Sequence, residues 1–343
     1  MRSARPVGLF LAAAAAVLWA VNLTVLQPLT EPIGPWSETL PGNNTYWARD
    51  LRFVAILGVV LGLVLAGRGD RRWSAPAVLL GGGWVAADLA LDRSDPTGAE
   101  STVLLAAAGC GLLAALATLL ALVERRNPGG VGQPADPAWQ RALIVAACVA
   151  GMSTMVAAGI ESPTDREPEL HPAAFATAAL LAALTIGCAL AAAPGVTRAR
   201  GWLAVGLGAV TVLGIGLVRA VPPGPRSLPE VTLGAVLLTG VTLLAWGWPG
   251  GRPAWGRHAL AAVAALIGPM AMLLLVGIFM IILRVGAPFT ALAGNSPIHA
   301  ADSDILISLA GLLVGLGMGL LLAWLPALAA APAQATRPAR PIS

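Results

Sequence analysis

Three residues on one polar stripe are the strongest candidates for chemistry in this sequence. Asp88 lies inside an otherwise apolar run, and Trp84, Asp88 and Asp92 recur at every fourth position. A helix places residues with this spacing on one face. A carboxylate within a bilayer is expensive and normally faces protein or a water-filled cavity, so Asp88 is a candidate functional residue. The stripe predicts a polar site, but it does not name a reaction.

The other residues of this hypothetical site come from neighbouring predicted spans. We predict that Asp88 pairs with Arg52, because a short turn joins their spans and makes them antiparallel neighbours; Arg219 and Asn22 are the reserve partners. The predicted binding residues, none of them assigned a catalytic role, are Asp88, Asp92, Arg52, Asn22, Arg219 and Arg284. The alternative is that Arg52 and Arg284 extend to the lipid headgroups and that Asp88 forms one structural ion pair.

The composition is that of an integral membrane protein. Hydrophobic residues make up 57% and charged residues 11% of the chain, whereas about a quarter of residues are charged in soluble domains. All 21 basic residues are arginine. With the abundant alanine, glycine and valine, this usage is typical of GC-rich bacteria, so we expect the bacterial plasma membrane. The arginines are scattered over short loops, which argues against nucleic-acid binding.

Runs of about 20 apolar residues predict an all-α polytopic bundle of about ten transmembrane helices in a lipid bilayer. The expected spans are 7–26, 51–67, 75–91, 101–123, 141–160, 173–193, 201–221, 230–248, 258–283 and 303–325. Because no loop could hold a soluble domain, residues 1–325 are predicted to form a single membrane domain. Residues 326–343, which are rich in alanine and proline, are predicted to form a disordered cytoplasmic tail.

The distribution of arginines predicts that both termini are cytoplasmic. Arginines are twice as frequent at the termini and in alternate loops as on the opposite side, where Asp88 and most other acidic residues fall. Cytoplasmic segments of membrane proteins carry the excess of basic residues. The loops on this basic side are 68–74, 124–141, 194–200 and 249–257.

Two sets of glycines recur at four-residue spacing. Gly58 and Gly62 lie in the second predicted span, and Gly311, Gly315 and Gly319 lie in the last. Small residues at this spacing let two helices approach closely. They predict packing inside the bundle, with docking of a membrane-protein partner as the alternative.

Gly268 and Pro269 lie near the middle of the ninth predicted span. Proline at this position removes one backbone hydrogen bond and predicts a kink. With five spans in each half, the counterpart of this helix is the fourth span, which carries Gly109 and Gly111 near its middle. Paired interruptions of this kind mark the central site of many transporters. The alternative is that the kink has a purely structural role.

Other polar groups are weaker candidates for a functional site than Asp88. Asp302 and Asp304 precede the last span and resemble the Asp-x-Asp element of membrane glycosyltransferases that use lipid-linked sugars, but acidic residues are also expected at a helix start. The acidic loop 161–172, with Glu167 and His171, is expected to be solvated. We find no spacing typical of metal ligands and no cofactor motif, so we expect neither a metal nor a cofactor.

The organisation of ten spans with cytoplasmic ends resembles the drug/metabolite transporter superfamily. The stretches Trp19–Asn22, Leu51–Phe53 and Val123–Arg125 are similar to the first half of that family, whereas the second half shows no matching pattern and the long first outer loop departs from it. The resemblance carries over no site residue.

We therefore interpret the chain as a permease for a small neutral, amphipathic or lipid-like molecule. One alternative is a non-catalytic accessory or assembly subunit of a membrane complex. The other is an outer-leaflet enzyme that acts on a lipid-linked substrate.

Overall fold

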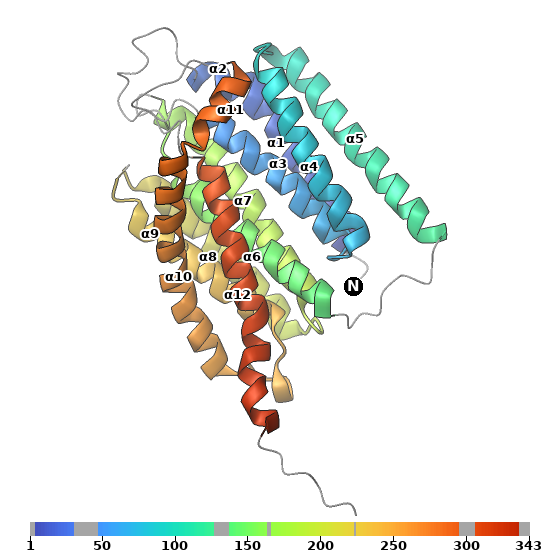
Figure 1. The fold of residues 1–343 in the computed structure, drawn as a ribbon, viewed down its shortest axis with the longest axis vertical. Helices are drawn as coiled ribbons and strands as arrows, with labels where there is room; N and C mark the ends of the chain where they lie inside the picture. Colours follow the sequence, from blue (N-terminus) through green and yellow to red (C-terminus); the bar gives the residue numbers. More distant parts are fainter. Residues whose placement is uncertain are drawn as a thin grey trace, which may run out of the picture.

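The chain is almost entirely helical wherever the structure describes it. The structure, a computed structural model, describes residues 4–30, 47–126, 137–162, 166–222, 224–294 and 306–335, with the backbone alone for residue 137 and residues 326–335. A π-helical turn, Asn22–Leu26, joins α1 to α2, and no strand occurs in these ranges. The helices (Figure 1) are α1 (Ala4–Val21), α2 (Gln27–Thr30), α3 (Trp47–Ala66), α4 (Arg71–Asp92), α5 (Gly98–Arg126), α6 (Pro137–Gly159), α7 (Glu167–Ala192), α8 (Arg198–Ala220), α9 (Ser227–Ala245), α10 (Trp255–Leu283), α11 (Gly286–Ala293) and α12 (Ile307–Ala335).

Within the described residues, nine helical stretches are long and apolar enough to cross a membrane. They coincide with nine of the ten predicted spans. The remaining predicted span, 51–67, corresponds to α3. This helix begins at Trp47 and carries Arg49, Asp50 and Arg52 in its first turns. These charges lower its hydropathy, but α3 is buried along almost its whole length, so protein rather than lipid surrounds them. The prediction of an all-α, multi-pass membrane bundle is confirmed.

The N-terminal end of α1 and the C-terminal end of α12 lie toward the same side of the bundle, the lower side in Figure 1. We call this side the inner end and the opposite side, which bears α11, the outer end, following the predicted orientation. Helix α12 continues to Ala335, past the predicted end of the last span at 325, because alanine, the strongest helix former, dominates its final turns. The rest of the predicted tail lies outside the described residues.

Helix α3 is the centre of the first half of the bundle, where it packs against α1 and α4. The backbones of α1 and α3 approach so closely that a Cβ atom at Gly62 would lie 2.8 Å from the backbone nitrogen of Ala12. Gly58 faces Ala15 in the same contact. Helix α5 completes this half by packing on α1.

Helix α6 is the centre of the second half, where it packs against α7, α9 and α12. Gly311, Gly315 and Gly319 all face α6, and a Cβ atom at Gly319 would lie 2.8 Å from Cα of Val145. Both predicted glycine faces are thus occupied inside the chain. This packing favours the prediction that the glycines serve contacts inside the bundle, and docking of a membrane-protein partner stays a prediction.

The two halves meet where α3 packs against α6, α7 and α12. Helix α10 lies on the outside of the second half and runs unbroken through Pro269, while Gly268 faces the Met318 side chain of α12. The proline therefore does not end the helix, and the kink at Gly268 and Pro269 stays a prediction. Arg284 ends α10 in the left-handed conformation, with φ of 48°, and turns the chain into α11.

Candidate functional site

The predicted ion pair between Asp88 and Arg52 is present and completely buried. Nε of Arg52 lies 2.9 Å from Oδ1 and 3.2 Å from Oδ2 of Asp88. Both side chains have 0% exposure. The pairing follows from the short connection between α3 and α4, which places the outer end of one helix beside the outer end of the other. The prediction that Arg52 is the partner of Asp88 is confirmed.

Two tryptophans complete the surroundings of Asp88. Nε1 of Trp19, on α1, donates a hydrogen bond of 2.7 Å to Oδ1 of Asp88. The Trp19 ring meets Trp84 edge to face, with 5.2 Å between the ring centroids. Trp84, Asp88 and Asp92 are all buried, so the predicted stripe does form one inward face of α4.

Asp92 shares the same arginine. Nη2 of Arg52 lies 3.0 Å from Oδ2 of Asp92, an ion-pair contact, and Nε2 of Gln27 donates a hydrogen bond to Oδ1. Asp92 is 1% exposed. Two carboxylates therefore face one guanidinium group. We call Arg52, Asp88, Asp92, Trp19 and Gln27 the α1–α3–α4 polar cluster.

The helix that supplies Trp19 and Gln27 changes its winding between them. Residues Asn22–Leu26 are π-helical, and π-helical turns occur frequently at functional sites. The predicted site residue Asn22 lies in this turn and is buried, but its Nδ2 atom has no hydrogen-bond partner among the described residues. Thr24 hydrogen-bonds to Thr102 of α5. Asn22 thus lies near the polar cluster in sequence, but among the described residues Asp88 accepts its hydrogen bonds from Trp19 and Arg52.

Arg219 belongs to a different cluster, so its assignment as a reserve partner of Asp88 is wrong. Its Nη2 lies 2.5 Å from Oε1 of Glu167, and Nη2 of Arg226 lies at the same distance from that oxygen. Ser162 donates to the other carboxylate oxygen through both its backbone nitrogen and its hydroxyl group. Arg219 lies on α8, in the second half of the bundle. The packing of the helices therefore places it beside Glu167 rather than beside Asp88.

Glu167 also corrects the expectation that the loop 161–172 is solvated. It is 8% exposed and begins α7, where a carboxylate is favoured by the helix dipole. A signal was available in the sequence, because Glu167 is followed by Pro168, a residue common in the first helical turn. Arg284, by contrast, is exposed, and the ion pairs of Asp88 and Asp92 are made with Arg52.

A third group of contacts fastens α11 across the outer end of α3. Nη1 of Arg49 donates a 2.9 Å hydrogen bond to Thr290, and Phe53 meets Phe289 with 5.7 Å between ring centroids. Ser308 of α12 donates a 3.2 Å hydrogen bond to Oδ1 of Asp50. The charges at the start of α3 therefore connect the two halves of the bundle.

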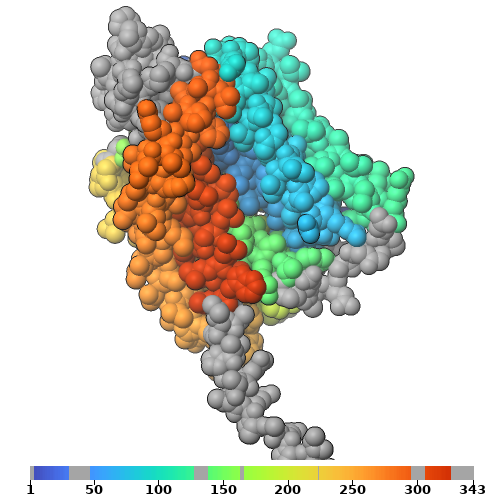
Figure 2. Space-filling view, in the orientation of Figure 1, coloured from blue at the N-terminus to red at the C-terminus, as the bar shows by residue number. Residues whose placement is uncertain are grey.

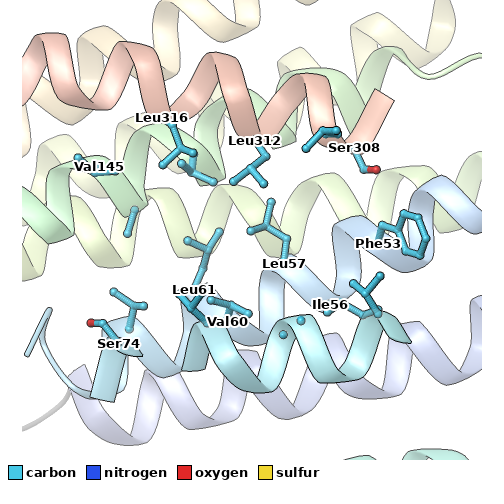
Figure 3. A pocket seen from close by; sticks show the side chains of 18 of the residues that line it. Phe53, Ile56, Leu57, Val60, Leu61, Ser74, Val145, Ser308, Leu312 and Leu316 are labelled. Carbon is cyan, nitrogen blue, oxygen red and sulfur yellow. The ribbon is translucent and has the colours of Figure 1, made fainter. Parts of the chain in front are cut away.

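An apolar groove of about 660 Å³ runs between the two halves below these contacts. Its walls are α3 and α4 on one side and α6 and α12 on the other, with Phe289 of α11 at the outer end. Figure 2 shows the hollow between α12 and α4, with α3 at its floor. Among the described residues that line it, only Ser74 and Ser308 have polar side chains, and they lie at opposite ends in Figure 3.

The groove and the polar cluster are neighbours that share no residue. Phe53 follows Arg52 in the sequence, and Val85, one turn before Asp88, lines the groove. Arg52, Asp88 and Asp92 do not line it and are enclosed in this conformation. Binding of a solute to these three residues, as the sequence predicts, stays a prediction.

Asp302 and Asp304 lie outside the described residues, and within those residues no group of three His, Cys, Asp or Glu side chains is placed to hold a metal ion. Comparisons of the chain with protein families, with curated proteins and with solved structures found no match. The function must therefore be inferred from the geometry of the groove and the clusters.

Proposed function

We propose that this protein is a permease that binds an amphipathic or lipid-like molecule in the groove between its two halves. The observation that carries the proposal is the groove itself, whose volume of about 660 Å³ lies in the ordinary range for small-molecule sites. Its position also supports the proposal, because transporters commonly bind their substrates where two halves of the bundle meet.

The length of the groove fits one acyl chain. The lining on α3 runs from Phe53 to Val64, which at about 1.5 Å per residue is roughly 16 Å. This is about half the ~30 Å thickness of the hydrocarbon core of a bilayer. An apolar chain whose length matches the depth of one leaflet can therefore lie along the groove.

The chemistry of the lining selects against polar solutes. Apart from Ser74 and Ser308, the described lining offers only aliphatic and aromatic side chains and two glycines. A sugar or an ion would lose its water without gaining hydrogen bonds, which is unfavourable. An apolar chain meets no such penalty and enters from the bilayer through the opening between α4 and α12.

The outer end of the groove has groups for a polar head. Ser308 both lines the groove and contacts Asp50. Arg49 and Thr290 form the hydrogen bond beside Phe289, which also lines the groove. An amphipathic molecule can thus place its chain among the apolar side chains and its head near these residues.

The test uses two glycines that are adjacent on α4. Gly82 lines the groove and Gly83 does not, and a Cβ atom at either position would meet nothing within 4 Å. Gly82→Trp should fill the groove, whereas Gly83→Trp should place the same side chain outside it. The protein is reconstituted in liposomes, and two quantities are measured: photo-crosslinking to a diazirine-bearing palmitate, and movement of a fluorescent lysophospholipid across the bilayer.

We expect Gly82→Trp to reduce both quantities severalfold and Gly83→Trp to leave them unchanged. Crosslinking that is insensitive to Gly82→Trp would overturn the groove as the binding site. Crosslinking by the wild-type protein without any lipid movement would overturn the permease and favour an accessory role.

A further inference from the structure

A second cavity lies at the inner end of the second half, where four helices end or begin. Its volume is about 670 Å³. The side chains that give it its character are Gln140 and Arg141 of α6, Arg257 and His258 of α10, and Trp246 and Trp248 after α9. It shares no lining residue with the groove between the halves.

Among the described residues, the cavity gathers positive charge without an opposing carboxylate. Arg141 and Arg257 line it, no described acidic residue does, and neither arginine forms an ion pair with any described residue. The buried Arg200 adds a third guanidinium group at its edge. Its Nη2 donates a 2.7 Å hydrogen bond to the carbonyl oxygen of Trp246, and its Cζ lies 4.8 Å from the centroid of the Trp248 ring.

Two helix N-termini add to this positive potential. Helix α6 begins at Pro137 and α10 begins at Trp255, so Arg141 and Arg257 lie in or next to the first turn of their helices. Neither first turn contains an acidic residue. The N-terminus of a helix carries a partial positive charge and favours anions, so the two helix ends and the arginines would together stabilise a bound anion.

A buried donor beside the cavity also lacks an acceptor. Trp246 is 5% exposed and lines the cavity, and its Nε1 has no hydrogen-bond partner among the described residues. The Trp246 ring stacks on His258 with 5.3 Å between centroids, which fixes the position of the indole. An unsatisfied buried donor is uncommon in a native structure, and this one adds to the polar character of the wall beside the cavity.

We propose that this cavity binds the phosphate group of an anionic phospholipid. Tryptophans concentrate at the depth of the lipid headgroups, and Trp246 and Trp248 place the cavity at that level. Arginines are suited to phosphate because their planar donors match its oxygens. Basic pockets between helices on the cytoplasmic side are known to accept phosphate-bearing headgroups.

The test compares two exposed arginines at the same end of the bundle. Arg257 lines the cavity, whereas Arg126, at the end of α5, does not. Arg257→Gln and Arg126→Gln remove the same charge from the same membrane face, and neither side chain makes a described contact that the fold needs. Purified protein in a neutral detergent is titrated with dihexanoyl phosphatidylglycerol, dihexanoyl phosphatidylcholine and inorganic phosphate, and binding is followed by calorimetry.

We expect saturable binding of the phosphatidylglycerol, weakened about tenfold or more by Arg257→Gln, as the loss of one charge-assisted hydrogen bond implies. Arg126→Gln should change the affinity less than about twofold, since it leaves the cavity intact. Equal weakening by both variants would overturn the site and indicate general attraction to the basic surface. Binding of inorganic phosphate without binding of the lipid would overturn the lipid assignment and indicate a soluble phosphate compound.

Discussion

Nε of Arg52 lies 2.9 Å from Oδ1 of Asp88, and neither side chain is exposed to solvent or lipid. The same guanidinium group also contacts Asp92. Burial of charges is favourable only when partners and hydrogen bonds compensate the lost hydration, and here one cation serves two carboxylates. Removal of Arg52 should therefore cost more stability than removal of either carboxylate.

Arg52→Gln should destabilise the protein much more than Asp88→Asn. Without Arg52 two buried carboxylates lack a cation, and breaking a buried pair costs about 3–5 kcal/mol. The amide introduced by Asp88→Asn keeps an oxygen that can accept from Trp19 and leaves Asp92 to balance Arg52, so the loss should be about 1 kcal/mol, as for one hydrogen bond. Reversible unfolding of each purified variant measures the difference.

An equal loss of stability in both variants would contradict this charge balance. If Asp88→Asn folds normally but stops lipid movement in liposomes, the cluster has a role in function beyond holding α1, α3 and α4 together.

Glu167→Gln should lower the free energy of unfolding by about 3–5 kcal/mol, because it leaves Arg219 and Arg226 without their shared buried carboxylate. Glu169→Gln is the matched control on the same helix turn. Glu169 is exposed and forms an ion pair with the exposed Arg166, and pairs of this kind contribute about 0–1 kcal/mol. Similar effects of the two substitutions would show that Glu167 is not the centre of a buried cluster in the membrane.

Gly315→Ala should destabilise the contact between α6 and α12. A Cβ atom at Gly315 would overlap the backbone of Val149, and overpacking of this kind costs about 1–3 kcal/mol. Gly277→Ala on α10 is the control, since its Cβ atom would meet nothing within 4 Å and alanine is the better helix former. Thermal unfolding in detergent should therefore show opposite shifts, and a stabilising Gly315→Ala would refute the close packing.

Most of the architecture follows from the sequence because hydropathy and span length are local properties. The pair Arg52–Asp88 could also be predicted, since the short turn between α3 and α4 leaves little choice of neighbour. The partner of Arg219 could not, because Glu167 lies 52 residues away in the chain and only the packing of α7 against α8 brings them together. The groove could not be predicted either, because the sequence does not distinguish apolar side chains that line a cavity from those that face lipid.

Cysteine labelling tests the predicted orientation, which the arrangement of helices alone does not define. In a background where Cys110, Cys148 and Cys188 are replaced by alanine, Glu169→Cys and Arg126→Cys each introduce one exposed thiol. A membrane-impermeant maleimide should label Glu169→Cys in intact cells and Arg126→Cys only after permeabilisation, because arginine-rich loops stay in the cytoplasm. The reverse pattern would invert the assignment of inner and outer ends.

Phe289→Ala should speed the exchange of lipid at the outer end of the groove. Phe289 lines the groove and closes on Phe53 with an edge-to-face contact. Such aromatic pairs contribute about 0.5–1.5 kcal/mol, so their loss corresponds to roughly a two- to tenfold faster release of a bound molecule. Stopped-flow release of a fluorescent lysophospholipid from reconstituted protein gives this rate directly.

The control for this variant is Phe279→Ala. Phe279 lies on α10, is exposed, and does not line the groove. The substitution Phe279→Ala therefore removes the same kind of side chain from the lipid-facing surface. We expect its release rate to equal that of the wild-type protein. The contact between Arg49 and Thr290 holds α11 in place in both variants, so a change confined to Phe289→Ala reports on the closure itself. An unchanged rate in Phe289→Ala would show that the contact between Phe53 and Phe289 does not limit passage along the groove.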